Sequence, residues 1–311
     1  NTINQYAFSG CESLNDIDLS KIVTFGNSAF NGAGLTSINL AAVTSLGDNV
    51  FDSNASLTQV TLNDELTSLS KSTFRLCTSL QSITLPTALT SLGSSYAFNE
   101  SGITSITIPA GVTVIPSNTF NGCADLASIT FLGEITEIGS GAFNGCKSLT
   151  AITLPESLTT IGGDVFLNCG NLATVELPAS VNSIGVNSFG ANTQVTVKEG
   201  NTTYTYLTEH SAVIDNTGKL IAIPKGASGD IVIPEGVTGI AGWLFNGKNA
   251  ITSLKFPASL ASIDANAFAY YQGTLDFSAV TLTSLPAQAF RNYRGASLTL
   301  PAGITAIGNY A

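Results

Sequence analysis

Charged side chains are scarce in this 311-residue sequence, at 10% of residues against roughly 25% in an average soluble protein. Serine, threonine and asparagine must cover much of the surface instead, which favours a secreted or surface-exposed β-rich protein over a cytosolic enzyme. The 11 basic residues are scattered through a chain of net charge −10, and this pattern excludes nucleic acid as a partner. The sequence contains no run of about 18 apolar residues, so we expect no membrane insertion within this chain.

Histidine occurs only once, at His210, and this scarcity limits the chemistry available. Catalysis needs a nucleophile, a base and an oxyanion site that converge, and no motif in the sequence supplies them. Glu134 and Glu137 are close in sequence, but spacing alone does not make an acid–base pair. We therefore predict that the protein is not an enzyme, and we expect neither a cofactor nor a metal.

A phenylalanine, usually within the motif xxAFxG, recurs every 21 to 24 residues with one gap of 56 residues. Such regularity indicates a repeat architecture, in which each unit packs on the next and no unit is stable alone. The pattern predicts about twelve coils. The phenylalanines are Phe8, Phe30, Phe51, Phe74, Phe98, Phe120, Phe143, Phe166, Phe189, Phe245, Phe268 and Phe290.

One unit reads LTTIGGDVFLNCGNLATVELP, residues 158–178. In its strand Leu172, Val175 and Leu177 alternate with outward polar residues, as expected for a half-buried strand, and a proline ends it. LTTIG provides a second short extended piece. The segment GDVFLNC is too short for a stable helix, so we interpret it as one helical or 3₁₀ turn that buries Phe166.

The consensus LTSIGxxAFxGCxSLxxITLP resembles the BspA-like leucine-rich repeat of bacterial surface proteins. The resemblance covers nearly the whole chain, although LTAITLP lacks the asparagine of ordinary leucine-rich repeats. It implies a right-handed leucine-rich-repeat superhelix, with a parallel sheet, short helical or 3₁₀ turns and no catalytic activity. We expect residues 1–311 to form a single β-rich solenoid.

Residues 190–244 interrupt the repeat. The stretch HSAVIDNTGKLIAIP predicts a β-hairpin with its turn at Asp215 to Gly218. Two readings are open for this insert: a decoration that covers coil edges, or a protruding recognition element that contains Tyr204 and Tyr206.

The five cysteines, Cys11, Cys77, Cys123, Cys146 and Cys169, each lie three residues after a repeat phenylalanine. They would therefore form one column of small buried side chains. Cys11 and Cys77 would be three coils apart, too far for a disulfide, and parallel side chains make bonding awkward elsewhere. We predict free thiols throughout.

A column of outward threonines offers the first candidate ligand contacts: Thr84, Thr107, Thr130 and Thr153. The column could be a plain solvated sheet, because threonine favours strands. It could instead bind an extended polar polymer. Ice is disfavoured because the coil spacing is uneven. Trp243 is a further candidate, either as an exposed anchor or as a residue packed against the insert.

These observations predict a secreted or cell-surface binding module, monomeric, that adheres to a host or extracellular-matrix protein or glycan. The alternative is a structural spacer without its own ligand. The chain opens inside a repeat at NTINQYAF and closes at ITAIGNYA, with no evident cap at either end. Because the ends of such a stack need covering, we expect a longer chain or covered ends.

Overall fold

The computed structural model describes residues 1–311 as a β-solenoid of about 14 coils of about 22 residues, with parallel strands and little helix. The count exceeds the twelve repeat phenylalanines because two coils lack one. The strand Gln194–Val197 pairs in register with Thr174–Leu177 and belongs to a further coil. The last coil ends at Ala311. The Ala311 carbonyl accepts from the Phe290 amide, just as the Ala289 carbonyl accepts from the Phe268 amide one coil earlier.

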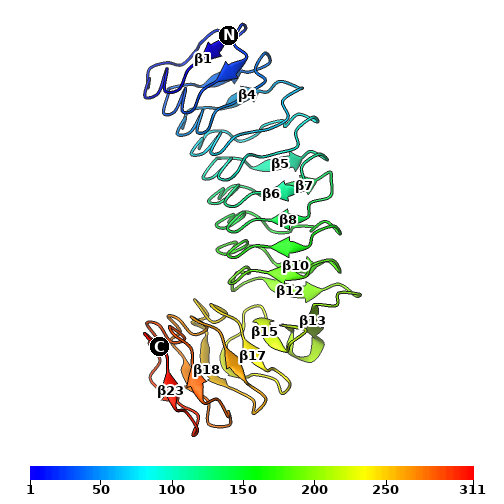
Figure 1. Cartoon of the computed structure of the whole chain (residues 1–311), viewed down its shortest axis with the longest axis vertical. Coiled ribbons are helices and arrows are strands. Elements are labelled where there is room, and N and C mark those ends of the chain that lie inside the picture. Colours follow the sequence, from blue (N-terminus) through cyan, green and yellow to red (C-terminus); the bar gives the residue numbers. More distant parts are fainter. The chain divides into compact units, whose positions relative to one another are not determined.

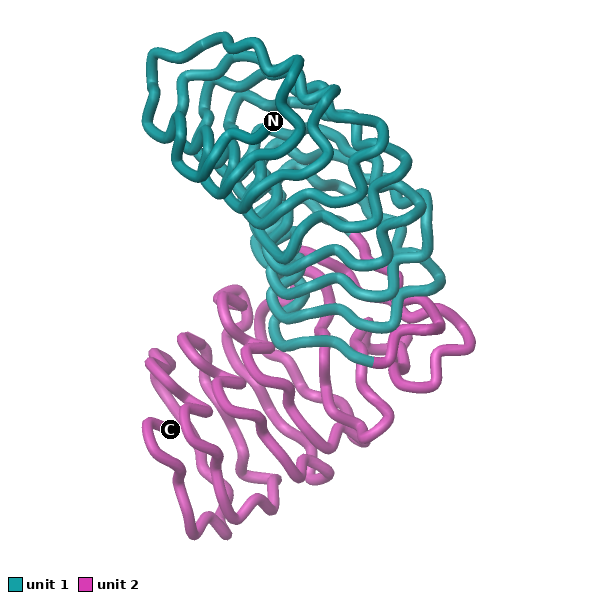
Figure 2. Tube along the Cα trace, turned by 45° about the horizontal axis from the view of Figure 1, so that its top comes forward, with its two compact units in different colours: residues 1–173, 183–190 teal, residues 174–182, 191–311 magenta.

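The coils divide into two compact units (Figure 2). The first unit contains residues 1–173 and 183–190, and the second contains residues 174–182 and 191–311. Within each unit, successive strands lie one above another along the stack (Figure 1).

Unit 1 contains four parallel sheets, β1–β2, β3–β4, β5–β7 and β11–β9–β8–β6. Each longer strand alternates buried and exposed residues, as in β5, where Ile106 and Ile108 point inward between exposed Ser105 and Thr107. The strands are β1 (Thr2–Ile3), β2 (Thr24–Phe25), β3 (Ser37–Asn39), β4 (Gln59–Thr61), β5 (Ser105–Ile108), β6 (Val114–Ile115), β7 (Ser128–Phe131), β8 (Glu137–Ile138), β9 (Thr160–Ile161) and β11 (Ser183–Ile184).

Unit 2 contains the sheets β10–β12, β16–β18–β20–β22 and β21–β23, and a five-stranded sheet β13–β14–β15–β17–β19. The last of these is mixed, because β13–β14 and β14–β15 pair antiparallel. The strands are β10 (Thr174–Leu177), β12 (Gln194–Val197), β13 (Tyr204–Leu207), β14 (Ala212–Asp215), β15 (Lys219–Ala222), β16 (Gly229–Val232), β17 (Gly239–Ile240), β18 (Ile251–Lys255), β19 (Ser262–Ile263), β20 (Thr274–Asp276), β21 (Ser284–Leu285), β22 (Leu298–Thr299) and β23 (Ala306–Ile307).

In residues 190–244, β14 and β15 are joined by a turn in which the Gly218 amide donates to the Asp215 carbonyl. The first residue after this turn forms an ion pair: the Lys219 ammonium lies 3.0 Å from an Asp264 carboxylate oxygen. Lys219–Ala222 also continues as a parallel neighbour of β17, so the antiparallel hairpin passes directly into the repeating sheet.

The phenylalanine column forms the centre of the core in both units. Neighbouring rings stack nearly parallel, with centroids 5.0 to 6.2 Å apart from Phe8 to Phe189. In unit 2 the rings of Phe245, Phe268 and Phe290 stack in the same way, at 5.4 and 5.5 Å. Each coil thus supplies the surface on which the next phenylalanine is buried.

The phenylalanine segments are turns and not the helical or 3₁₀ turns predicted. At every repeat phenylalanine the residue two positions earlier has a positive φ, as in Asn118 (58°), and most have another two positions later, as in Gly122 (76°). Left-handed residues on both sides cannot belong to a right-handed helical turn. The one helix is the 3₁₀ helix η1 (Thr208–His210).

Candidate ligand-binding face

The outward residues of neighbouring strands in unit 1 line a shallow groove of about 460 Å³. Its floor is the sheet β5–β7 and the preceding extended segment, residues 82–85. The β5–β7 register places Ser105 beside Ser128 and Thr107 beside Thr130. The lining residues are Ser82, Ile83, Thr84, Leu85, Thr87, Ser105, Ile106, Thr107, Pro109, Ser128, Thr130 and Leu132.

Two rows of hydroxyls cross this groove, one of serines and one of threonines, at the roughly 4.8 Å spacing of parallel strands. None of these hydroxyls hydrogen-bonds to the protein, and no charged side chain lines the groove. Leu132, 60% exposed, adds an apolar margin. The arrangement can both donate to and accept from a neutral polar ligand.

Threonines at two other positions of the repeat in unit 1 behave differently. Thr104 donates its hydroxyl to the Gln81 carbonyl at 3.2 Å, and Thr159 donates to Thr136 at 3.0 Å. The same bond recurs at Thr58, Thr90 and Thr136. These threonines join one coil to the previous one, whereas the threonines in the groove have free hydroxyls.

The predicted contact residues are placed in three environments. Thr84, Thr107 and Thr130 line the unit 1 groove, and Thr153 is exposed one coil further along but is not part of its lining. The other three candidates lie in unit 2. They are Tyr204, which is 7% exposed, and half-buried Tyr206 and Trp243.

The three aromatic candidates belong to two different segments of unit 2. Tyr204 and Tyr206 lie on β13, opposite Asp215 and Val213 of β14, while Trp243 follows β17 in the left-handed position before Phe245. The threonine column is therefore the predicted set that the fold assembles into one surface.

The sequence reading missed a second groove, of about 530 Å³, on the sheet β16–β18–β20–β22 of unit 2. It is the charged counterpart of the first groove. The residues that line it are Asp230, Thr252, Ser253, Leu254, Lys255, Thr274, Leu275, Asp276, Ser297 and Thr299. The signal was present as polar residues at outward strand positions, but each looks like an ordinary solvated residue until the strands are aligned.

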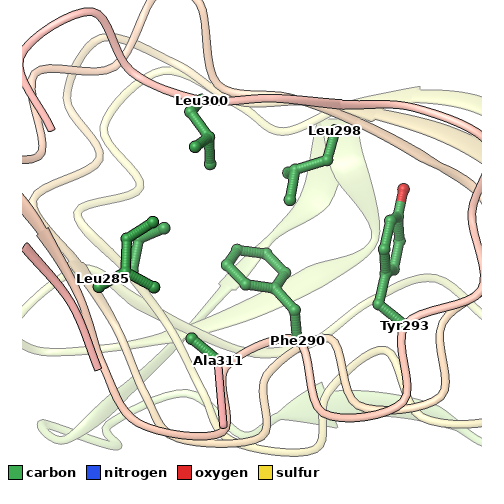
Figure 3. Close-up of a pocket in the computed structure, with 7 residues that line it drawn as sticks. Leu285, Phe290, Tyr293, Leu298, Leu300 and Ala311 are labelled. Carbon is green, nitrogen blue, oxygen red and sulfur yellow. The ribbon is translucent and has the colours of Figure 1, made fainter. Parts of the chain in front are cut away.

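An apolar hollow of about 290 Å³ lies in the last coil (Figure 3). Figure 3 shows the Phe290 ring among Leu285, Leu298 and Leu300. Phe290 stacks on Phe268 on one side, whereas its other side faces this hollow. The hollow is thus the end face of the phenylalanine column rather than a site with polar groups to orient a ligand.

All five cysteines are free thiols, and all but half-buried Cys11 are buried. Burial raises the pKa of the Cys77 thiol to about 12 and that of Cys123 to about 11. A thiol with a raised pKa holds little thiolate at neutral pH and is a poor nucleophile and metal ligand. No group of three or more histidine, cysteine or acidic side chains is arranged to hold a metal ion.

A family model described as BspA type leucine rich repeat region matches residues 1–126, 94–212 and 227–311, in six copies. The chain belongs to this family. The phenylalanine and cysteine columns described above are therefore features of a BspA-type repeat.

Several solved structures share the BspA-type fold of this chain. A leucine-rich repeat protein from Bacteroides ovatus is 21% identical, with a TM-score of 0.56 over 92% of this chain and 78% of its own. A leucine rich cell surface protein from Faecalibacterium prausnitzii is 24% identical, with a TM-score of 0.61 over 92% and 73%. The pneumococcal vaccine antigen PcpA is 18% identical, with a TM-score of 0.51 over 99% and 64%.

A search of curated proteins finds no match to the sequence. The chain contains no helix that is long and apolar enough to cross a membrane.

Proposed function

We propose that this BspA-type chain is a non-enzymatic binding module, secreted or displayed on a cell surface, that adheres to a host or extracellular-matrix protein or glycan. The names of two similar structures, a cell surface protein and a vaccine antigen, support the location. The low content of charged residues supports it as well.

One observation carries the binding role: the hydroxyls of Thr84, Thr107 and Thr130 line one groove without a protein partner, while other threonines, such as Thr104 and Thr159, use theirs to join coils. Free hydroxyls at regular spacing, without charge, fit an extended neutral polymer lying along the sheet. Thr153 extends the same row by one coil.

The test is a screen of the purified chain against matrix proteins and a glycan array, followed by titration of the strongest binder. The variant Thr107→Lys/Thr130→Lys places two charges in the groove and should weaken binding at least about tenfold, or about 1.4 kcal/mol. The matched control is Thr67→Lys/Thr113→Lys, which alters two exposed threonines outside the groove. Equal weakening by both variants would contradict the proposed face.

The alternative is a spacer that holds other segments apart without a ligand of its own. The regular phenylalanine column, which needs no ligand, is the feature that favours it. Failure of the wild-type chain to bind any matrix protein or glycan in the screen would favour the spacer.

A further inference from the structure

The second groove differs from the first in one respect: it contains charged side chains in fixed register. The outward positions of β16, β18, β20 and β22 form two rows. Asp230 lies beside Ser253 and then Thr274 in one row, and Lys255 lies beside Asp276 and then Thr299 in the other. All six residues line the 530 Å³ groove.

An irregularity in the sheet orients the Asp230 carboxylate. The register between β16 and β18 shifts after Gly229, so that Gly229 pairs with Ile251 but Asp230 pairs with Ser253. Thr252 is the extra residue, and a bulge of this kind redirects a side chain. As a result two neighbouring hydroxyls, of Thr252 and Ser253, both donate to Oδ1 of Asp230, at 2.8 and 2.6 Å.

This arrangement leaves Oδ2 of Asp230 with no protein donor. The two hydroxyl hydrogen bonds lower the pKa of the Asp230 carboxyl, with a smaller effect from Lys255, so the group is a carboxylate at neutral pH. Other outward positions of this row, such as Ser105 and Ser128 in unit 1, carry no charge. The unit 1 groove thus contains no oriented carboxylate of this kind.

Asp276 and Lys255 complete the set. Oδ1 of Asp276 accepts from the Ser278 amide at 2.9 Å, and the Ser278 hydroxyl also interacts with this carboxylate, so the two contacts orient it. Lys255 is in register with Asp276, yet its ammonium forms no ion pair with either carboxylate. The groove therefore presents two oriented carboxylates and an ammonium that is in no ion pair with them.

A ligand for this groove must donate and accept hydrogen bonds over several strand spacings of roughly 4.8 Å each. Sugar hydroxyls do both. The formal charge of Asp230, Lys255 and Asp276 together is only −1, so the groove does not select strongly for an ion.

We propose that the unit 2 groove is a saccharide-binding site, in which Asp230 and Asp276 accept from the hydroxyls of a neutral oligosaccharide and Lys255 donates to one of its oxygens. The inference does not rest on the proposed function, because no residue of the unit 1 groove takes part in it.

The experiment is isothermal titration of the full chain with maltohexaose, cellohexaose, laminarihexaose and chitohexaose, with a decalysine peptide and heparin as charged probes. We expect saturable binding of at least one neutral hexasaccharide. Asp230→Asn and Lys255→Met should each weaken it at least about tenfold, because each removes a group that faces the ligand. Thr252→Ala/Ser253→Ala should weaken it less, since the carboxylate stays but loses its orientation.

The matched control is Glu176→Gln, which neutralises an exposed carboxylate on β10, outside the groove. It should leave the affinity unchanged, as should the unit 1 variant Thr107→Lys/Thr130→Lys, so failure of this site and failure of the proposed function can be told apart. The proposal is overturned if no neutral hexasaccharide binds, if decalysine or heparin is preferred, or if Asp230→Asn and Lys255→Met bind like the wild-type chain. Thermal unfolding midpoints within about 2 °C of wild type verify that each variant is folded.

Discussion

The thiol of Cys146 donates a hydrogen bond to the main-chain carbonyl of Phe120, with a sulfur–oxygen distance of 3.2 Å. The same bond joins Cys77 to Phe51, Cys123 to Phe98 and Cys169 to Phe143, at 3.2, 2.9 and 3.0 Å. In one of the coils without a cysteine at this position, Asn54 donates its side-chain amide to the Phe30 carbonyl instead. In these five coils the side chain of the column thus donates to the phenylalanine carbonyl of the previous coil.

Buried thiols with raised pKa values should resist alkylation in the folded protein. We expect iodoacetamide at pH 7.5 to label none of the four buried cysteines within an hour, and to label all five in denaturant. Cys11 is half-buried and should be the first to react. Mass spectrometry after proteolysis locates the label. Rapid modification of native Cys146 would show that the column opens.

The same thiols predict a loss of stability at alkaline pH. In the unfolded chain they ionise near 9.0, whereas in the folded chain burial raises the pKa of Cys123 and Cys169 to about 11 and that of Cys77 to about 12. The unfolded state therefore binds fewer protons above pH 9. The stability is fully present below that pH and falls by up to about 1.4 kcal/mol per pH unit for each thiol until the folded pKa is reached.

The measurement is the urea midpoint between pH 7 and 10.5, for the wild type and for a variant with serine at positions 77, 123, 146 and 169. Serine donates the same hydrogen bond but does not titrate in this range. The difference between the two curves isolates the thiols. Parallel curves would mean that the thiols keep ordinary pKa values.

The phenylalanine column can be tested at Phe143, which is fully buried between the rings of Phe120 and Phe166 at 5.5 and 5.7 Å. Phe143→Ala should lower the free energy of unfolding by about 3–5 kcal/mol, because it empties a site that neither neighbour can fill. Leu132→Ala, at a 60% exposed residue, is the control and should cost less than about 1 kcal/mol. Urea denaturation measures both. A loss of stability below about 1 kcal/mol for Phe143→Ala would show that the phenylalanine column is not part of the core.

The residue two positions before each repeat phenylalanine has a left-handed backbone, so the stability of variants at this position should depend on how easily the new residue adopts a positive φ. Asn49 has a φ of 55°. Asn49→Val should cost about 1–2 kcal/mol, because a β-branched residue is strained there, whereas Asn49→Gly should be close to neutral. Thermal unfolding compares the two. A valine variant as stable as the glycine variant would contradict a left-handed backbone at this position.

Lys248 stands in the cysteine column, three residues after Phe245, and burial lowers the pKa of its ammonium to about 8. The unfolded chain holds this proton up to about pH 10.5, so this group makes the stability rise with pH between 8 and 10.5. Lys248→Met should stabilise the protein at pH 7 by on the order of 1–3 kcal/mol and abolish that rise. Exposed Lys147→Met is the control. A destabilised Lys248→Met would indicate that the lysine has a partner.

Sequence periodicity was sufficient to place the core, because burial repeats with the coil. The phenylalanine positions, the alternation in β5 and β10 and the parallel sheet follow from side-chain type alone. The backbone conformation of the turns could not be predicted from side-chain type. Its left-handed position is held by residues as different as Tyr6, Asn118 and Trp243, whose side chains give no common signal.

The candidate sites were predictable only in part for a related reason. The threonine row could be predicted because the same residue recurs at one register position. Asp230, Lys255 and Asp276 are each separated by more than twenty residues and differ from their equivalents in other coils. Their convergence depends on strand register and on the bulge at Gly229, neither of which appears in the sequence pattern.

The hydrogen bonds that build each column reach one coil and no further, which has a consequence for how the gene can change. Removal of residues 121–143 would join Phe120 directly to Asn144, which follows Phe143 as Asn121 follows Phe120, and every column of unit 1 would close up intact. Loss of only a few residues within a coil would instead misalign the phenylalanine, cysteine and threonine columns where that coil meets its neighbours. Unequal recombination between repeats can therefore lengthen or shorten the protein in whole coils, so relatives of different length can arise while the buried surfaces stay the same.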